Sequence, residues 1–271
     1  MTAPDKKGRA EGLCGRLRRP GFFLNAAGRL AARYVRAVRA ASGPVREPGG
    51  MDRDRSGVLL SLYRGATSAA RPAAMTILRR RAARGKELPE RLSERLGIAT
   101  APRPERPLFW FHAASVGETN AILPLVHELK RRHPALNILL TTVTVTSAKI
   151  AAARLPQGAI HQFVPLDNPR FCRRFMLHWR PDLGIFTESE IWPNLIVEAS
   201  GSGVPLVLAN ARMSESSSKL WRRFPSLAKP VFSRFDLVLA QTASFAKRLS
   251  GIGARKRDEL FEVRPGSDGA L

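Results

Sequence analysis

One short stretch, SVGE, combines the residue types that a proton-transfer site and a helix start both require. Ser115 and Glu118 lie three residues apart, and Gly117 directly precedes the glutamate. This spacing is that of a capping box, in which each side chain bonds a free backbone N–H of the first helical turn. The glycine also gives a ligand close access to the backbone, and a helix N-terminus stabilises an ionised carboxylate. Glu118 is therefore either a helix cap or a general base that accepts a proton.

Two further polar stretches carry groups that suit contacts with a substrate. TESEIWPN places Glu188 and Glu190 two residues apart at a predicted strand end, which suits metal binding or acid–base chemistry. No histidines stand nearby at metal-ligand spacing, so we predict no metal site. NARMSESS offers Arg212 with several hydroxyl groups, a combination suited to phosphate or carboxylate; the alternative is a solvated loop that starts a helix. The histidines of this region fall on different predicted elements and are expected to be packing or surface residues: His112, His161 and His178.

The order of hydrophobic segments indicates the framework that carries these stretches. Short apolar runs alternate with segments whose apolar residues recur at helical spacing. Strands are expected at 108–114, 136–145, 160–166, 183–187, 205–211 and 237–241. Helices are expected at 118–132, 147–155, 169–179, 193–200, 217–224, 226–235 and 243–253. This alternation predicts an α/β fold with a doubly wound parallel sheet, a Rossmann-like domain that spans about residues 107–254.

Polar loops follow the first five predicted strands of this domain. Their sequences are SVGET, TVTS, PLDNP, TESEIWPN and NARMSESS. In a doubly wound sheet, ligands bind at the carboxyl ends of the strands, on the loops that lead into the helices. The sequence thus predicts one site on one rim of the sheet.

The charge balance points to an anionic partner. The 271 residues carry 45 Lys and Arg against 22 Asp and Glu, a formal net charge of +23. Such a surplus suits nucleic acid, phosphate-bearing lipid or a nucleotide, unless arginine-rich coding bias is its cause. The basic residues are dispersed and no helix-turn-helix, KH or RRM signature is present, so we expect no nucleic-acid partner. Two cysteines, Cys14 and Cys172, predict no disulfide framework and fit a reducing compartment.

Two basic segments precede the predicted sheet. Residues 1–50 are interpreted as a disordered or spurious extension; the alternative is a basic amphipathic helix on an anionic membrane. Residues 51–106 are predicted to be a membrane-proximal helical segment that ends in the proline-rich linker APRPERP. No apolar run approaches the ~20 residues that a membrane-spanning helix needs. Several residues of the second segment suit either a lipid surface or packing on the domain itself: Leu59, Leu60, Leu62 and Tyr63.

Taken in order, HAASVGE, TTVTVTS, PLDNP, ESEIWPN and NARMSESS resemble the N-terminal half of the 3-deoxy-D-manno-octulosonic acid (Kdo) transferases, over about residues 51–254. The resemblance implies a GT-B fold, in which the active site lies between two Rossmann-like domains. It implies transfer of Kdo from CMP-Kdo to a lipid A precursor, lipid IVA, with inversion and without a metal ion or other cofactor. This step of lipopolysaccharide core synthesis takes place at the cytoplasmic face of the bacterial inner membrane. The implied partners are the lipid A precursor, CMP-Kdo where a donor domain is present, and an anionic membrane surface, reached by peripheral or N-terminal attachment.

The resemblance also assigns roles to residues. The glutamate of SVGE is the family's proposed general base, and it falls on Glu118. It would deprotonate the acceptor hydroxyl as that oxygen attacks the anomeric carbon of Kdo, and a capping role can hold the carboxylate in place for this. Glu188 and Glu190 match the second acidic motif, where a structural or acceptor-side role is favoured. Substrate-binding or site-shaping roles are expected for the other motif residues: Ser115, Gly117, Asn194, Asn210, Arg212 and Ser214.

The sequence departs from the family in three places. Ser147 stands where glycine is usual, and Ser189 stands where threonine is usual. Residues 255–271 form an atypical tail where the family usually reads GNLKFD. From the resemblance we expect that the donor-binding C-terminal domain is missing. A reading frame shifted by one base permits LKFD in this tail, so we hypothesise a frameshift between about residues 251 and 257. The chain as it stands is then expected to be inactive, because it lacks the donor positioning that supplies much of the rate.

A second hypothesis comes from a different class of protein. In it, the chain is a non-catalytic binding module for anionic lipid or a lipid A precursor. Such a module would keep the basic N-terminal region and the rim loops but would not turn over CMP-Kdo.

Overall fold

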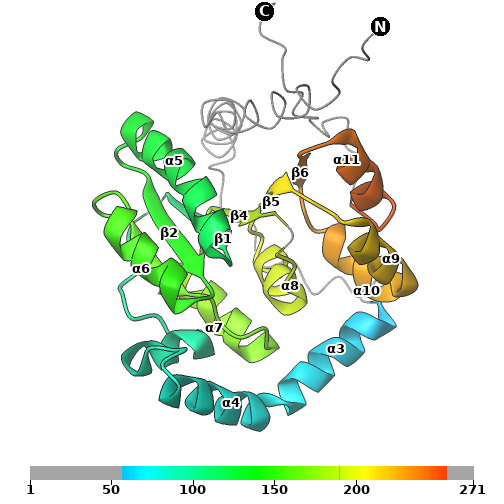
Figure 1. Ribbon diagram of the computed structural model, residues 1–271, viewed down its shortest axis with the longest axis horizontal. Coiled ribbons are helices and arrows are strands. Elements are labelled where there is room, and N and C mark those ends of the chain that lie inside the picture. The colour runs from blue at the N-terminus through cyan, green and yellow to red at the C-terminus, as the bar shows by residue number, and fades with distance from the viewer. Residues whose placement is uncertain (1–56, 106, 189, 255–271) are drawn as a thin grey trace, which may run out of the picture.

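A computed structural model describes residues 57–105, 107–188 and 190–254 (Figure 1). The predictions for residues 1–50 and 255–271 lie outside the described residues. The chain begins with three helical segments: α3 (Val58–Ala69), α4 (Arg71–Ala83) and the 3₁₀ helix η2 (Pro89–Leu96). Six strands follow: β1 (Leu108–Ala113), β2 (Asn137–Thr142), β3 (Ile160–Phe163), β4 (Leu183–Thr187), β5 (Leu206–Ala211) and β6 (Leu237–Ala240). The helices between and after them are α5 (Val116–Arg132), α6 (Val145–Arg154), α7 (Pro169–Trp179), α8 (Pro193–Gly201), α9 (Glu215–Arg223), α10 (Pro225–Phe232) and α11 (Ala243–Ser250).

The six strands form one sheet in the order β3-β2-β1-β4-β5-β6, and every pair is parallel. The predicted α/β class with a doubly wound, Rossmann-like sheet is confirmed. The strand order reverses between β1 and β4, whose register pairs His112 with Phe186. Ligands of such sheets bind at this switch point, beyond the carboxyl ends of the two strands. The loops that leave β1 and β4 carry the SVGE and ESE motifs.

Helices cover both faces of the sheet, which explains why its strands read as nearly continuous apolar runs. In β1, Leu108 and Trp110 belong to one core cluster, together with residues of α7, α8 and α10. Phe109 and Phe111 belong to the other cluster, with residues of α5 and α6. Successive side chains of a strand point to opposite faces, and helices cover both faces, so all four side chains are buried.

The predicted strand 136–145 is too long, because β2 ends at Thr142. The β-branched run TTVTV favours a strand, but the Thr144 side chain accepts a hydrogen bond from the Ser147 N–H and caps α6. The Ser147 hydroxyl lies 2.7 Å from the Thr144 hydroxyl and is buried. Ser147, at the position where the resemblance implies a glycine, is therefore part of this cap.

Helix α3 packs on the domain, against α7 and α10, and runs with α4 along one edge of the molecule (Figure 1). Leu60 is 1% exposed and joins the core cluster that includes α10. In contrast, Val58 and Leu62 are 72% and 62% exposed. The sequence allowed either a lipid surface or packing on the domain for this segment. Leu60 packs on the domain, whereas Val58 and Leu62 are open to solvent. In the part of the chain that the structure describes, no helix is both long and apolar enough to cross a membrane.

Candidate functional site

Glu118 lies in the first turn of α5, directly beyond β1, where the sequence predicted a capping box. Ser115 is the N-cap residue, and its hydroxyl accepts a hydrogen bond from the Glu118 N–H at 3.2 Å. The same hydroxyl donates to Glu118 Oε1 at 2.9 Å. Glu118 Oε2 accepts from the N–H of Ala114 at 3.0 Å, one residue before the cap. The reciprocal pair confirms the capping box, with the carboxylate reaching one residue further back than in the standard motif.

A third hydrogen bond to this carboxylate comes from across the switch point. The hydroxyl of Thr187, the last residue of β4, donates to Glu118 Oε2 at 2.9 Å. Thr187 and Glu118 are 69 residues apart in the chain, and both are buried, Glu118 to 5% exposure. A capping role does not need this bond, because the cap is complete within residues 114–118. No motif in the sequence indicates Thr187 as a site residue, and only the adjacency of β1 and β4 reveals its role.

The two acids of the ESE motif lie on the loop after β4 and share an electrostatic environment with Glu118. Burial raises the pKa of Glu188, and the Glu118 charge raises it further, while Arg212 opposes the shift. Burial also raises the pKa of Glu190; a hydrogen bond from Trp192 opposes this, and the charges of Glu118 and Glu188 add to it. Glu118, Glu188 and Glu190 therefore form one acidic cluster, in which the charge of Glu118 disfavours ionisation of the other two.

The backbone turns sharply at this loop. Glu188 has a φ of 55°, a left-handed conformation that is uncommon for a residue other than glycine, so the strand does not continue through the ESE motif. Asn210 has the same φ of 55° on the neighbouring strand β5, beside an irregularity in the pairing with β6. Backbone strain of this kind concentrates at functional sites, and here two such residues lie at one rim, Glu188 directly after β4 and Asn210 on β5. The Gln241 side chain donates to Asn210 Oδ1.

Arg212 and Ser214, both predicted from NARMSESS, lie on the next loop of the rim. Arg212 is half-exposed and forms an ion pair with Glu188 at 3.7 Å. Its N–H also donates to the Glu188 carbonyl at 3.4 Å, which joins the loops after β4 and β5. Ser214 is exposed and caps α9 by accepting from the Ser217 N–H at 3.1 Å. Arg212 is thus next to the acidic cluster, whereas the contacts of Ser214 are those of a helix cap.

Gly117 is exposed on the first turn of α5. A Cβ atom built on it would meet nothing closer than the Ser115 hydroxyl at 3.8 Å. Packing within the protein therefore does not require a glycine at this position. The interpretation that Gly117 leaves room for a ligand to approach the backbone is consistent with this open space.

Asn194 is the predicted site residue that lies farthest from solvent. It is fully buried, and its side-chain nitrogen donates to the Asp167 carbonyl at 2.7 Å and to the Thr67 hydroxyl at 3.0 Å. These contacts shape the interior behind the rim rather than its surface. Asp167 belongs to the PLDNP loop, and the loop sequence alone does not indicate its contact with Asn194.

The histidines occupy packing positions, as predicted. His112 is fully buried at the end of β1, its Nδ1 lies 3.0 Å from the Thr141 hydroxyl, and burial lowers its pKa to about 3. His161 pairs with Thr142, and burial together with Arg91 lowers its pKa to about 3. His178 lies edge-on to Trp179. Among the described residues, no three His, Cys, Asp or Glu side chains are placed to hold a metal ion.

Comparison with known proteins agrees with this geometry. The family model described as 3-deoxy-D-manno-octulosonic-acid transferase (kdotransferase) matches residues 90–261. A probable mitochondrial 3-deoxy-D-manno-octulosonic acid transferase of Arabidopsis thaliana is 42% identical over 179 residues, 65% of this chain and 40% of the relative. The transferases of Rickettsia felis and Haemophilus influenzae are 39% and 36% identical, over 59% and 62% of this chain and 34% and 39% of their own lengths. The chain thus spans about two fifths or less of the length of these three relatives. With a family model that covers all five rim loops, the chain belongs to the 3-deoxy-D-manno-octulosonic acid (Kdo) transferase family.

Proposed function

We propose that the chain forms the acceptor-side part of a GT-B Kdo transferase, with Glu118 as its general base. In the proposed reaction, Glu118 takes the proton of a hydroxyl group of the lipid A precursor lipid IVA. The freed oxygen attacks the anomeric carbon of Kdo, and the bond to CMP breaks as the new glycosidic bond forms on the opposite face, with inversion. One observation carries the proposal: in a chain of this family, a buried carboxylate is held at the switch point by three donors, one of which the helix cap does not use.

The hydrogen bonds distinguish the two oxygens of this carboxylate. Among the described residues, Oε2 accepts from two donors, the Ala114 N–H and the Thr187 hydroxyl, whereas Oε1 accepts from Ser115 alone. Each carboxylate oxygen has two lone-pair sites, so Oε1 keeps one for a further proton. We therefore assign Oε1 as the atom that accepts the proton of the acceptor hydroxyl.

The two acids of the ESE motif suit contact with sugar hydroxyls better than contact with the phosphate of the donor. Glu188 and Glu190 lie close enough to Glu118 for its charge to raise the pKa of both. Like charges repel, so a role of Glu188 and Glu190 in binding the phosphate of CMP-Kdo would be unfavourable. Sugar hydroxyls can donate to such carboxylates, which supports an acceptor-side role for the ESE motif.

The proposal is tested by separating acceptor binding from transfer. We expect the purified chain to bind lipid IVA in detergent micelles, and Glu118→Gln to retain this binding. Transfer from CMP-Kdo is then measured on the chain alone and on the chain joined to the C-terminal remainder of the Haemophilus influenzae relative. The expectation that the chain alone is inactive stays a prediction, which the first of these assays checks.

In the joined protein, Glu118→Gln should abolish transfer. Glu128→Gln is the matched control, because Glu128 lies on the same helix and pairs with Arg131 and Arg132 on its surface. Transfer that survives Glu118→Gln, or a chain that does not bind lipid IVA, would refute the proposal. Acceptor binding without transfer in any form of the protein would instead favour the non-catalytic binding module.

We further propose that α3 and α4 attach the chain peripherally to the cytoplasmic face of the inner membrane. Apolar side chains are exposed on both helices, with Val58 and Leu62 on α3 and Ile77 on α4, which is 57% exposed. Arginines of α4 accompany them and would meet anionic headgroups. We expect the chain to float with phosphatidylglycerol vesicles but not with phosphatidylcholine vesicles. The variant Leu62→Glu/Ile77→Glu should stay at the bottom of the gradient, and flotation unchanged by it would contradict this attachment.

A further inference from the structure

Helix α8, which follows the ESE motif, begins without a cap of its own. Its N-cap residue is Trp192, which makes no side-chain capping bond, and Pro193 follows it. The missing cap is supplied by Asp167, from the PLDNP loop between β3 and α7. Asp167 Oδ1 accepts from the Leu195 N–H at 2.9 Å, and Oδ2 accepts from the Asn194 N–H at 3.2 Å. These N–H groups belong to the first turn, where a negative charge also stabilises the helix dipole.

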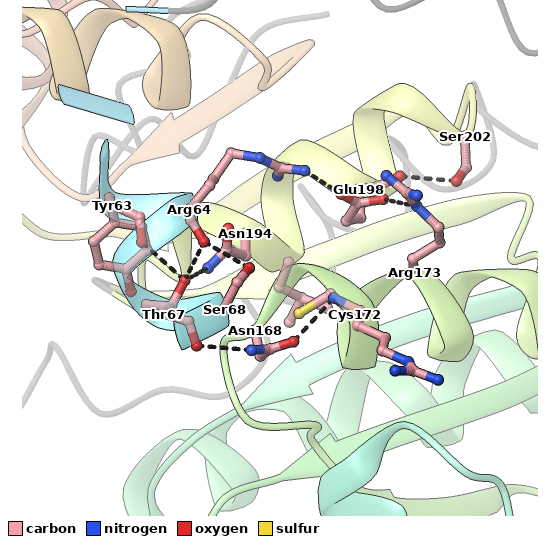
Figure 2. A network of polar contacts seen from close by, with 12 residues as sticks. Tyr63, Arg64, Thr67, Ser68, Asn168, Cys172, Arg173, Asn194, Glu198 and Ser202 are labelled. Carbon is pink, nitrogen blue, oxygen red and sulfur yellow. Dashed lines mark hydrogen bonds and ion pairs between the residues drawn. The ribbon is translucent and has the colours of Figure 1, made fainter. Parts of the chain in front are cut away.

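The same carboxylate binds helix α3. The Tyr63 hydroxyl donates to Asp167 Oδ2 at 2.8 Å. One turn further along α3, the Thr67 hydroxyl accepts from the Asn194 side chain, and the Thr67 carbonyl accepts from the Asn168 side chain at 2.7 Å. Figure 2 shows how these residues of α3 gather around Asn194 at the start of α8.

A second contact joins α3 to the opposite end of α8. Arg64 forms an ion pair with Glu198 at 2.6 Å, and Arg173 of α7 contacts the other oxygen of Glu198 at 3.1 Å (Figure 2). Helix α3 is therefore fixed to α8 at two separate places. The contacts through Asp167 and Thr67 lie at the end of α8 that faces the rim, and the Glu198 contact does not.

The first turn of α8 positions Trp192, and Trp192 in turn holds Glu190 at the rim. Trp192 directly precedes the helix, and its indole N–H donates to Glu190 Oε2 at 3.0 Å. The indole ring lies edge-on to His112, with ring centroids 5.9 Å apart. A shift of the first turn of α8 would move Trp192, and with it the only side-chain hydrogen bond that the described contacts give to Glu190.

We propose that Asp167 is a positioning residue, which fixes the first turn of α8 and thereby holds the Trp192–Glu190 pair at the rim, and that Tyr63 couples α3 to this position. The network holds a buried anion at a cost: burial raises the pKa of Asp167, and the donors from Tyr63, Asn194 and Leu195 oppose that shift. A buried carboxylate is tolerated only where donors satisfy it, and here the donors come from α3 and α8 together. A contact between Glu190 and the acceptor rests on the proposed function. The placement of Trp192 and Glu190 by Asp167 does not depend on it.

The indole N–H signals of the four tryptophans in a ¹H–¹⁵N spectrum test this inference. The Trp192 signal is assigned by its loss in Trp192→Phe. In Asp167→Asn, an amide replaces one acceptor oxygen and opposes an N–H group of α8, so the Trp192 signal should move. The ¹³C titration of Glu190 should show a further rise in its pKa, because the hydrogen bond from Trp192 that lowers it is weakened.

The matched control is Arg64→Gln, which disturbs the same pair of helices at Glu198, away from the rim. It should lower the stability but leave the Trp192 signal and the pKa of Glu190 unchanged. Tyr63→Phe removes one donor while the cap remains, so it should move the Trp192 signal less than Asp167→Asn and provides the test if that variant does not fold. Asp167 would be merely structural if its variant moved the signal no more than Arg64→Gln does, and a silent Tyr63→Phe would remove the coupling to α3. Neither measurement uses Kdo transfer, so a failure here is distinguishable from a failure of the proposed function.

Discussion

The bond between Thr187 and Glu118 allows a quantitative test of how the candidate base is held. Replacing Thr187 with valine keeps the shape of the side chain and removes its hydroxyl. The Thr187 hydroxyl has two acceptors in reach, the His112 carbonyl at 3.0 Å and Glu118 Oε2 at 2.9 Å, and the carboxylate is the stronger one. A hydrogen bond to a charged group contributes about 1.5–3 kcal/mol. Because Glu118 is 5% exposed, water has little access to replace the lost donor.

We therefore expect Thr187→Val to lower the free energy of unfolding by about 2 kcal/mol, measured by urea unfolding. Thr187→Ser should recover most of this, since it restores the hydroxyl. Thr142→Val is the control: it removes a buried hydroxyl at the end of β2 that pairs with the neutral His161 at 2.9 Å, and should cost about 1 kcal/mol.

A double-mutant cycle of Thr187→Val with Glu118→Ala isolates the contact itself. The coupling energy should be about 1.5–3 kcal/mol, the value for a hydrogen bond to a charged group. A coupling below about 0.5 kcal/mol, the usual error of additivity for independent sites, would show that the capping box alone holds Glu118. The assignment of Oε1 as the proton acceptor would then lose its basis.

Three further predictions follow from the site and its surroundings. Gly117→Ala should leave the stability unchanged or raise it by up to about 1 kcal/mol, since alanine favours a helix and its Cβ has room, yet it should weaken lipid IVA binding; unchanged binding would contradict a close approach of the ligand. Glu118→Gln should lower the pKa of both glutamates of the ESE motif in ¹³C titrations, because the neighbouring charge that raises them is gone, whereas Glu128→Gln should leave them unmoved. Burial lowers the pKa of His161 from 6.5 to about 3 in the folded protein. As the pH falls below 6.5, the unfolded chain therefore binds a proton that the folded protein does not, and the free energy of unfolding decreases. This amounts to about 2 kcal/mol by pH 5, and His161→Gln should remove that part of the pH dependence from urea unfolding curves.

Much of the sheet could be predicted from local pattern because the central strands are buried on both faces. Apolar runs such as LFWFHA and LGIFT leave no polar side for solvent, and helices of regular period separate them. The end of β2 was predicted wrongly for a physical reason: TTVTV has strong strand propensity, but the Thr144 hydroxyl gains a bond by capping α6. Local competition between a strand and a cap is decided by what lies around it, not by propensity alone.

The hydrogen bonds of Glu118 also divide into local ones, which the sequence could predict, and one that depends on the tertiary structure. Its bonds to Ala114 and Ser115 span four residues or fewer, so the motif SVGE was sufficient to predict a capping box. The bond from Thr187 exists because β1 and β4 are neighbours in the sheet. Other strand orders would satisfy the same alternation of strands and helices, so no motif could reveal it.

By itself the sequence determined the kind of fold, the order of the rim loops and the cap that orients Glu118, because these depend on hydrophobic period and on residues close in the chain. The tertiary structure alone decided which loops meet at the switch point and that Asp167 caps α8. It also decided that one face of α3 is buried against the domain while Leu62 stays open. These outcomes depend on which elements become neighbours, and that is set by the packing of the whole core rather than by any one segment.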